Sequence, residues 1–293
     1  MTAHRLAVLT AAATGVLIVF GGLVTNTGAA LAVPDWPTTF GHNMFLYPPS
    51  GMVGGVFYEH SHRLLGALVG LLTIVLAVSL WRAGGRLRAL GMAAVVAVLV
   101  QGVIGGLRVV LTADALAMVH GPFAQAFFAF VVALALLTSP RMETPAPVLD
   151  GATRTLSVVT VVLVYLQIVF GALLTHAGYL ALHLAGATAV FVVAPMATAR
   201  LRRSGDAVAA PAARVALTLL GVQLALGAGS YLARFSAIWI PGGQVTMLLL
   251  PVAHRLAGGL LLATTVVMAV RVLASARRTP ITGLTTAPVG AAR

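Results

Sequence analysis

The chain has 293 residues, of which 60% are hydrophobic and only 8% charged, and its formal net charge is +12. Its mean hydropathy of +1.03 excludes an ordinary soluble domain. The basic residues fall between apolar runs, which excludes a nucleic-acid surface concentrated on one face. No cysteine is present, so disulfides and thiolate metal sites are excluded as well.

Eight apolar runs of about twenty residues follow one another, each long enough for an α-helix to cross a hydrocarbon core. Lipid-exposed backbone must form its hydrogen bonds within its own segment, and these runs are too long and uniform for barrel strands. We therefore expect an all-α integral membrane protein with eight transmembrane helices. The predicted spans are 6–26, 62–81, 89–110, 117–138, 155–175, 181–199, 213–233 and 249–270.

The basic residues, all of them arginine, predict the orientation in the membrane. Cytoplasmic segments of membrane proteins are enriched in Lys and Arg. If the N-terminus is cytoplasmic, the inner segments hold 14 of the 18 arginines, and the outer side keeps Arg63, Arg108, Arg234 and Arg255. We expect a multi-pass protein of the cell (inner) membrane with both termini cytoplasmic.

Two segments of the chain are similar to each other: 17-LIVFGGLVTNTG-28 and 167-QIVFGALLTHAG-178 are identical at seven of twelve positions. The pattern continues in 101-QGVIGG-106 and 223-QLALGA-228, where a Gln is followed four residues later by Gly. Small residues at such spacing let transmembrane helices approach closely. We expect two pseudo-symmetric four-helix bundles in a parallel repeat. The predicted domains are residues 1–140, a cytoplasmic linker at 141–154, and residues 155–293.

Four of the eight histidines share one place in this pattern, at or near the start of an even-numbered helix and close to the outer surface. They are His62 and His120 in the first half, and His183 and His254 in the second. A heme iron takes two axial imidazoles from opposite sides, and facing helices of a bundle supply that geometry. Two bis-histidine heme sites are predicted, although a single histidine at a helix end is more often interfacial and unliganded.

Arg63 and Arg255 directly follow two of these histidines. Arginine binds carboxylates through two parallel hydrogen bonds, and a b-type heme carries two propionates. Both arginines are therefore candidates for propionate binding. The alternative is that they extend to lipid headgroups.

Glu59 makes the first half different from the second. It lies three residues before His62, so on a helix the two share a face, whereas the second half has Leu180 at the aligned position. We expect a cofactor site in the second half and a reaction site in the first. One alternative makes Glu59 a cap at the start of its helix. Another makes 60-HSH-62 part of a metal site.

Together these residues resemble the heme A synthase family over nearly the whole chain. The similarity rests on 59-EHSHR-63, 120-HGPFAQ-125, the His183 helix, 254-HRLAGG-259 and the Pro-x-Trp-Pro segment within 28-GAALAVPDWPTTFG-41. The resemblance implies an oxidoreductase that converts the C8 methyl group of heme O to a formyl group through a hydroxymethyl intermediate, giving heme A for terminal cytochrome oxidases. It implies that His62 and His120 serve substrate heme O, that His183 and His254 hold a heme B cofactor, and that Glu59 matches the family glutamate.

One departure from the family concerns the first outer loop, where many members carry a cysteine pair. This chain has Val33 and Thr38 or Thr39 in that neighbourhood, so a mechanism that requires those thiols cannot operate here. Besides heme O and membrane lipid, the resemblance implies heme O synthase and cytochrome oxidase assembly factors as partners. It also implies an electron acceptor that the sequence does not identify.

Three other functions compete with this one. A di-heme b-type cytochrome would exchange electrons with quinone and leave its hemes unmodified. A prenyltransferase that makes heme O would need paired aspartate-rich motifs, and the six acidic residues form no such cluster. A transporter would place polar groups near the membrane midplane, whereas the four histidines lie near one face. The di-heme cytochrome is therefore the main alternative.

Overall fold

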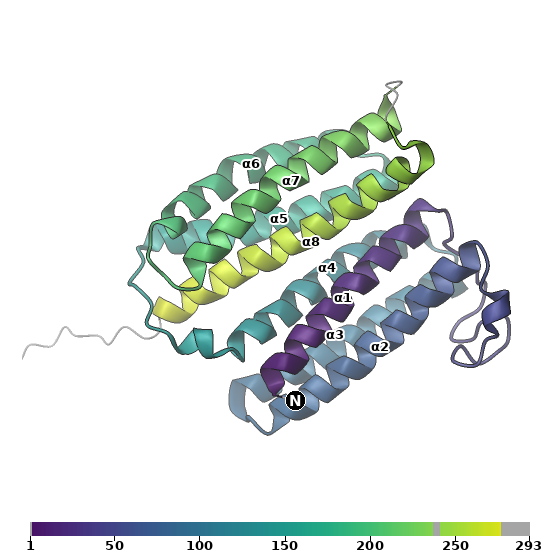
Figure 1. The fold of residues 1–293 in the computed structure, drawn as a ribbon, viewed down its shortest axis with the longest axis horizontal. Helices are drawn as coiled ribbons and strands as arrows, with labels where there is room; N and C mark the ends of the chain where they lie inside the picture. Colours follow the sequence, from purple (N-terminus) through teal and green to yellow (C-terminus); the bar gives the residue numbers. More distant parts are fainter. Residues whose placement is uncertain (1, 237–240, 277–293) are drawn as a thin grey trace, which may run out of the picture.

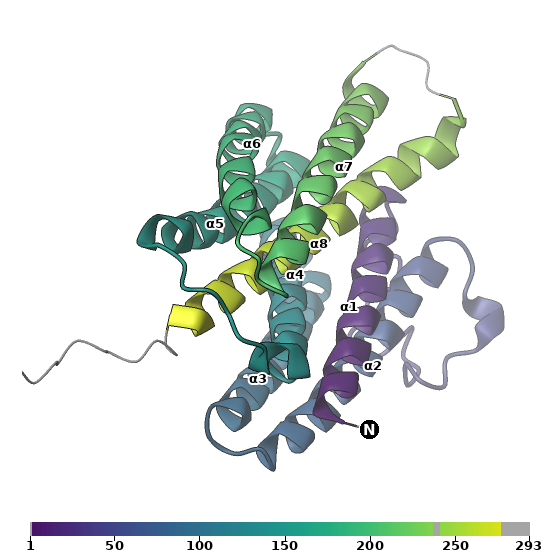
Figure 2. The same cartoon turned by 60° about the vertical axis from the view of Figure 1, so that its left-hand side comes forward.

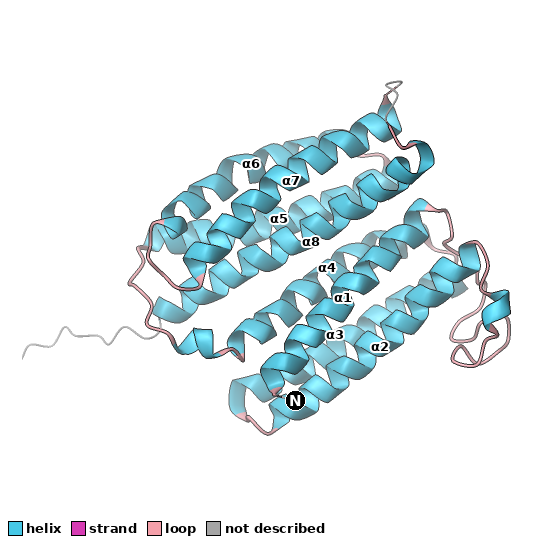
Figure 3. Ribbon diagram, in the orientation of Figure 1, coloured by secondary structure: helices cyan, strands magenta, loops and turns pink. Residues whose placement is uncertain are grey.

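The computed structural model describes residues 2–236 and 241–276, which are all-α, without a β-strand (Figures 1 and 3). Within these residues eight helices are long and apolar enough to cross a membrane, as predicted. They are α1 (Ala3–Asn26), α2 (Gly55–Trp81), α3 (Gly85–Val110), α4 (Asp114–Leu137), α5 (Gly151–Ala177), α6 (Leu180–Arg202), α7 (Ala209–Phe235) and α8 (Gly243–Ala276). Two short 3₁₀ helices, η1 (Pro49–Gly51) and η2 (Pro140–Glu143), lie in the connections.

The helices extend beyond the apolar runs that predict them. α2 begins at Gly55 instead of residue 62, and α8 has 34 residues and begins at Gly243 instead of residue 249. A hydrophobic run marks only the part of a helix that crosses hydrocarbon, whereas backbone hydrogen bonding continues beyond it. His62 therefore lies about two turns inside α2, and His254 about three turns inside α8, instead of at the helix starts.

Helices α1–α4 gather on one side of the molecule and α5–α8 on the other (Figure 1). α8 joins the two groups, because it contacts α1 and α4 as well as α5 and α7 (Figure 2). One cluster of buried apolar side chains continues through both groups, with Leu76 and Leu134 from the first and Leu201 and Met268 from the second. The parallel repeat and the domain boundaries at 141–154 stay predictions.

Large apolar side chains also cover the outside of the helices. Leu71, Val78, Leu99 and Phe191 are each more than half exposed. A soluble protein with so many exposed apolar side chains would aggregate, whereas in a membrane they face lipid tails. Together with the eight apolar helices, this surface identifies a multi-pass membrane protein.

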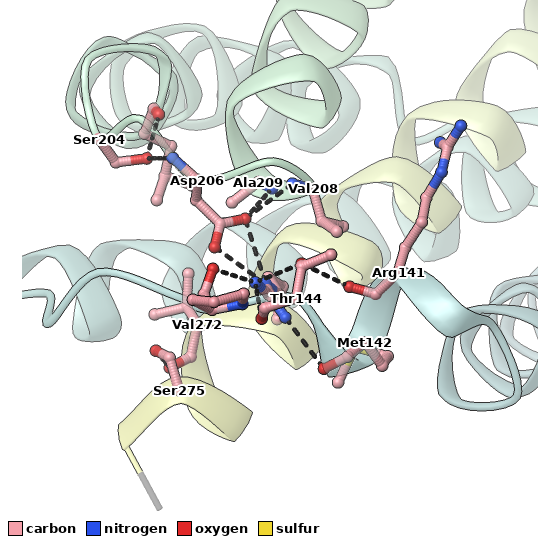
Figure 4. A network of polar contacts seen from close by, with 12 residues as sticks. Arg141, Met142, Thr144, Ser204, Asp206, Val208, Ala209, Val272 and Ser275 are labelled. Atoms are coloured by element: carbon pink, nitrogen blue, oxygen red, sulfur yellow. Dashed lines mark hydrogen bonds and ion pairs between the residues drawn. The ribbon is translucent and has the colours of Figure 1, made fainter. Parts of the chain in front are cut away.

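A buried ion pair fastens the linker between the two groups of helices (Figure 4). Arg271 on α8 donates its Nε–H to both carboxylate oxygens of Asp206, at 3.2 and 2.9 Å, and both side chains are almost fully buried. Its Nη1 donates to the Met142 carbonyl, and its Nη2 donates to the carbonyls of Thr144 and Pro145. We call these five residues the linker clamp. The clamp gives a buried guanidinium the hydrogen-bond partners that it needs.

Asp206 also bonds to the start of α7. Its Oδ1 accepts hydrogen bonds from the N–H groups of Val208 at 2.8 Å and Ala209 at 2.6 Å. The first N–H groups of a helix have no partner within the helix, so a carboxylate here satisfies them. One side chain thus connects the α6–α7 loop, α7 and α8.

Candidate functional site

The four histidines predicted as heme ligands lie in two facing pairs. The ring centroids of His62 on α2 and His120 on α4 are 6.4 Å apart, with 71° between the ring planes. Those of His183 on α6 and His254 on α8 are 6.3 Å apart, with 65° between the planes. Two imidazoles that bind one metal ion from opposite sides have centroids about 6 Å apart, because each metal–nitrogen bond is roughly 2 Å and each nitrogen lies about 1 Å from its ring centre. Both spacings fit an iron ion between the rings.

The donor set around the rings fits heme better than a bare metal ion. Across residues 2–236 and 241–276, no group of three or more His, Cys, Asp or Glu side chains is placed to hold a metal ion. Heme needs only two ligands from the protein, because the porphyrin supplies the other four. The Nδ1 atoms of His62, His120 and His254 are buried without a hydrogen-bond partner. Such atoms are uncommon in folded proteins and are typical of functional sites.

Each ring lies against a glycine on the preceding odd-numbered helix. A Cβ atom at Gly21, Gly105, Gly171 or Gly227 would lie 3.1, 2.9, 3.4 or 3.1 Å, respectively, from Cε1 of the facing histidine. A Cβ atom would force the ring or the helix to move at Gly105 and would be tight at Gly21 and Gly227, whereas at Gly171 it would make an ordinary van der Waals contact. The histidine spacing does not predict these contacts. A glycine at the same place in all four odd-numbered helices is the signal that reveals them.

Glu59 is buried near the start of α2 and ties this helix to the first outer loop, residues 27–54. Its Oε2 accepts a hydrogen bond from the Val33 N–H at 3.0 Å, and its Oε1 accepts one from Nη2 of Arg63 at 2.9 Å. The side chains of Glu59 and Arg63 are 6% and 9% exposed. The carboxylate therefore bonds to the loop and to Arg63, and the residue at the N-cap of α2 is Gly54. The helix-cap alternative gains no support.

Arg63 extends this contact along the loop. Its Nη1 donates to the carbonyls of Asp35 at 2.6 Å and Thr38 at 2.9 Å, and its Nη2 donates to the carbonyl of Val33 at 2.9 Å. We call Glu59 and Arg63 together the loop anchor. Val33 and Thr38, two of the positions noted for the missing cysteine pair, are thus both held by the anchor through their backbones. Propionate binding by Arg63 stays a prediction.

Trp36 brings the first outer loop to the first histidine pair. The indole packs so closely on Gly106 of α3 that no Cβ would fit there. The neighbouring Gly105 faces His120. Trp36 is 40% exposed, so part of the indole remains accessible at the edge of this site. The loop therefore places an aromatic side chain on α3, at the position next to the glycine that faces His120.

Asp35 organises the loop around this tryptophan. Its carboxylate accepts hydrogen bonds from the N–H groups of Phe40 and Gly41, both at 2.8 Å, and from the Thr38 hydroxyl. Burial alone would raise the pKa of Asp35, but the hydrogen bonds from Gly41, Thr38 and Phe40 outweigh it and lower the pKa to about 2. Asp35 is therefore an ionised structural group of the loop at neutral pH.

His60 points away from the first histidine pair. It is 1% exposed, its Nδ1 lies 3.1 Å from the Thr39 hydroxyl, and its ring centroid is 5.2 Å from that of Tyr47. His62 instead faces His120. The two histidines of the HSH segment thus have different partners, and the metal-site alternative gains no support.

Two further arginines lie near the histidine pairs. Arg255 on α8 donates its Nη1 to the Gly22 carbonyl on α1 at 3.4 Å, and its predicted propionate contact stays a prediction. Arg108, in the last turn of α3, has a buried Nε without a hydrogen-bond partner. It lies within electrostatic range of both His62 and His120. Sequence reasoning places Arg108 on the outer side but not at a site, because only the fold brings it to this histidine pair.

The chain is similar to one known protein family and to several heme A synthases. The model of a family described as cytochrome oxidase assembly protein matches residues 4–292. A heme A synthase of Shouchella clausii is 32% identical over 180 residues, which are 59% of this chain and 58% of that protein. Those of Alkalihalophilus pseudofirmus and Geobacillus kaustophilus are 32% and 29% identical, over 55% of this chain and 56% and 52% of their own lengths. The chain thus spans little more than half the length of these relatives.

Proposed function

We propose that this chain, which belongs to the family of cytochrome oxidase assembly proteins, is a heme A synthase that oxidises the C8 methyl group of heme O to a formyl group through a hydroxymethyl intermediate. The observation that carries the proposal is the presence of two histidine pairs with matching spacing, of which only the first has a buried carboxylate one turn away. The similarity to heme A synthases supports the same reaction.

In this proposal the second pair holds the permanent cofactor. His183 and His254 would bind the iron of heme B, which when bound supplies one-electron redox chemistry. At the position that aligns with Glu59, this half has Leu180. A site without a carboxylate suits a cofactor that is not chemically changed. The first pair, His62 and His120, would bind the substrate heme O.

Glu59 would serve the oxidation at the first pair. Converting a methyl group to a formyl group takes up the oxygen of one water molecule and releases four protons and four electrons, which pass to the electron acceptor that the resemblance implies. Positive charge builds on the reacting carbon during this oxidation. A carboxylate one turn from His62 would stabilise this charge and accept protons. The Val33 N–H and Arg63 hold the carboxylate in position. Trp36, which packs on Gly106 of α3, would help to exclude bulk water.

A di-heme b-type cytochrome is the second candidate, because the two histidine pairs are nearly identical in spacing and ring angle. Such a protein would keep two permanent hemes, exchange electrons with quinone and leave the hemes unmodified. The cytochrome function does not explain why a buried carboxylate lies near only one of the two histidine pairs.

Pigment extraction distinguishes the two functions. Cells that make heme O and lack heme A are compared with and without this chain, and the extracted hemes are separated and identified by mass. We expect heme A to be present only when the chain is present, and absent again with His62→Ala. Two hemes B per purified chain and an unchanged heme pool would support the cytochrome and contradict the synthase.

A further inference from the structure

Glutamine amides contact the histidines in three of the four consecutive odd–even helix pairs. Gln101 on α3 donates its Nε2–H to the backbone carbonyl of His120 at 3.0 Å. Gln167 on α5 donates in the same way to the carbonyl of His183 at 3.0 Å. The Nε2 of Gln167 also lies 3.2 Å from each ring nitrogen of His183. These amides therefore fix the helix backbone at the histidine, and one of them reaches the ring itself.

Gln223 on α7 makes the third contact, with its Nε2 at 3.3 Å from Nε2 of His254. Each glutamine lies four residues, one helical turn, before the glycine that faces the same ring. In all three amides Oε1 is buried without a hydrogen-bond partner. An amide that leaves an oxygen unsatisfied within a membrane protein is costly. All three amides lie against a histidine, two of them at its backbone carbonyl and two at its ring, which indicates a shared role there.

Helix α1 breaks this pattern. Gly21 faces His62 just as the other glycines face their rings, but the residue one turn before it is Leu17. Leu17 packs against the apolar core, and its side chain offers no hydrogen bond, so only its backbone is left to bond to the His62 ring. The Nδ1 atom of His62 is buried without a partner. Among the residues that the structure describes, His62 is thus the one facing histidine without a glutamine beside it.

We propose that the three glutamines are positioning residues for heme-ligating histidines, and that Leu17 makes His62 the exchangeable ligand. This inference rests on the proposed function and deepens it. In the second site both ligands, His183 and His254, lie against a glutamine amide, as a permanent cofactor requires. The first site has one ligand with a glutamine amide beside it, His120, and one without such an amide, His62, as required of a site that must admit heme O and give up heme A.

The expected size of the effect follows from metal sites in general. A group that bonds to a metal-binding histidine fixes the orientation of the ring, and its loss typically lowers metal affinity about 10- to 100-fold. Most differences in affinity between related sites arise from the dissociation rate. The quantity to measure is therefore the rate at which heme leaves the first site, which contains His62.

The test adds the missing amide with Leu17→Gln and removes an existing one with Gln223→Leu. Purified protein is loaded with heme B at both sites, and the transfer of heme to excess apomyoglobin is followed by absorbance. We expect Leu17→Gln to slow the loss of first-site heme by about tenfold or more, and Gln223→Leu to speed the loss of second-site heme by a similar factor. Leu17→Met, which conserves volume without adding an amide, should keep the wild-type rate.

Low-spin EPR signals, assigned to each site with His62→Ala and His254→Ala, show which heme is lost. A purely structural role would change protein yield but neither these signals nor the transfer rates. Transfer rates equal to wild type in Leu17→Gln and Gln223→Leu would overturn the proposal, and Gln223→Leu decides it if Leu17→Gln does not fold. Loading with heme B needs no conversion of heme O. A failure to make heme A in cells would therefore contradict the proposed function without affecting this test.

Discussion

Glu59 has two possible tasks, and a single mutation that lowers activity would not distinguish them. Its carboxylate would act on the substrate, yet its two oxygens also bond to Val33 and Arg63 and so hold the first outer loop. A charge that is fixed before the reaction needs no reorganisation during it, which favours a catalytic role. The same bonds would make the loop sensitive to any change at this residue.

Glu59→Gln keeps the shape and hydrogen bonding of the side chain but cannot become anionic. We expect this variant to fold, to bind heme B through His183 and His254, and to accumulate heme O or its hydroxymethyl intermediate. Heme A formation should fall about 100-fold or more, the usual contribution of an acid–base group. Pigment extraction measures the ratio of the hemes.

The matched control for this experiment is Arg63→Gln, which breaks the loop anchor and leaves the Glu59 carboxylate in place. A smaller loss of heme A formation than with Glu59→Gln is expected. Wild-type yields of heme A from Glu59→Gln would rule out its catalytic role. Equal losses from both variants would leave Glu59 as an anchor only.

The division of labour between the histidine pairs is testable one residue at a time. His183→Ala or His254→Ala should remove low-spin heme B from the purified protein, because the iron loses one of its two axial ligands. His62→Ala or His120→Ala should leave much of it. Absorbance spectra and the ratio of heme to protein give the result. Equal depletion by all four substitutions would contradict separate substrate and cofactor sites.

The helices show which parts of this fold can be predicted from the sequence and which cannot. Apolar runs predict all eight spans, because hydrophobicity reports the crossing of hydrocarbon. They miss the start of α2, because its polar residues find partners in the first outer loop and the helix continues through them. The contact of Glu59 with Val33 joins residues 26 positions apart, and no periodicity encodes it. A single ring-facing glycine is equally hard to recognise, since glycine is common in transmembrane helices, and only its repetition in all four odd-numbered helices reveals the contact.

Close packing of α7 on α8 gives a prediction for one such glycine. A Cβ atom at Gly227 would lie 3.1 Å from Cε1 of His254. We expect Gly227→Val to push this ring out of line with His183 and to lower bound heme B several-fold. In the control Gly221→Val, on the same helix, the new Cβ meets nothing within 4 Å. Equal heme-to-protein ratios in the two variants would show that this contact is unimportant for the site.

At the scale of the whole molecule, the linker clamp joins segments that are far apart in sequence. Arg271→Ala would leave Asp206 buried without its ion-pair partner, which typically costs about 3–5 kcal/mol of stability. We expect a clear drop in the thermal unfolding temperature of the detergent-solubilised protein. The control is Arg200→Ala, because the Arg200–Asp150 pair is exposed and such pairs contribute little. Similar drops in both variants would mean that the clamp contributes no more than a surface pair.

Orientation in the membrane is the last property of the whole molecule that the charges predict. The N-terminus, the linker and the last described turns of α8 lie at one end of the helices, and the first outer loop lies at the other (Figure 1). The segments assigned to the first of these ends hold 14 of the 18 arginines, although Arg277, Arg278 and Arg293 lie outside the described residues. Because arginine-rich segments stay in the cytoplasm, we expect both termini there and the first outer loop on the opposite side.

Reporter fusions test this orientation directly. A reporter that works only in the cytoplasm should be active when fused after Arg293, and one that works only outside should be active when inserted between Phe45 and Leu46. This insertion site suits the purpose because both side chains are strongly exposed, at 68% and 78%, in a loop away from the helices. An external C-terminus would contradict the orientation. It would also place the loop anchor, and with it the carboxylate of the first histidine pair, on the cytoplasmic side.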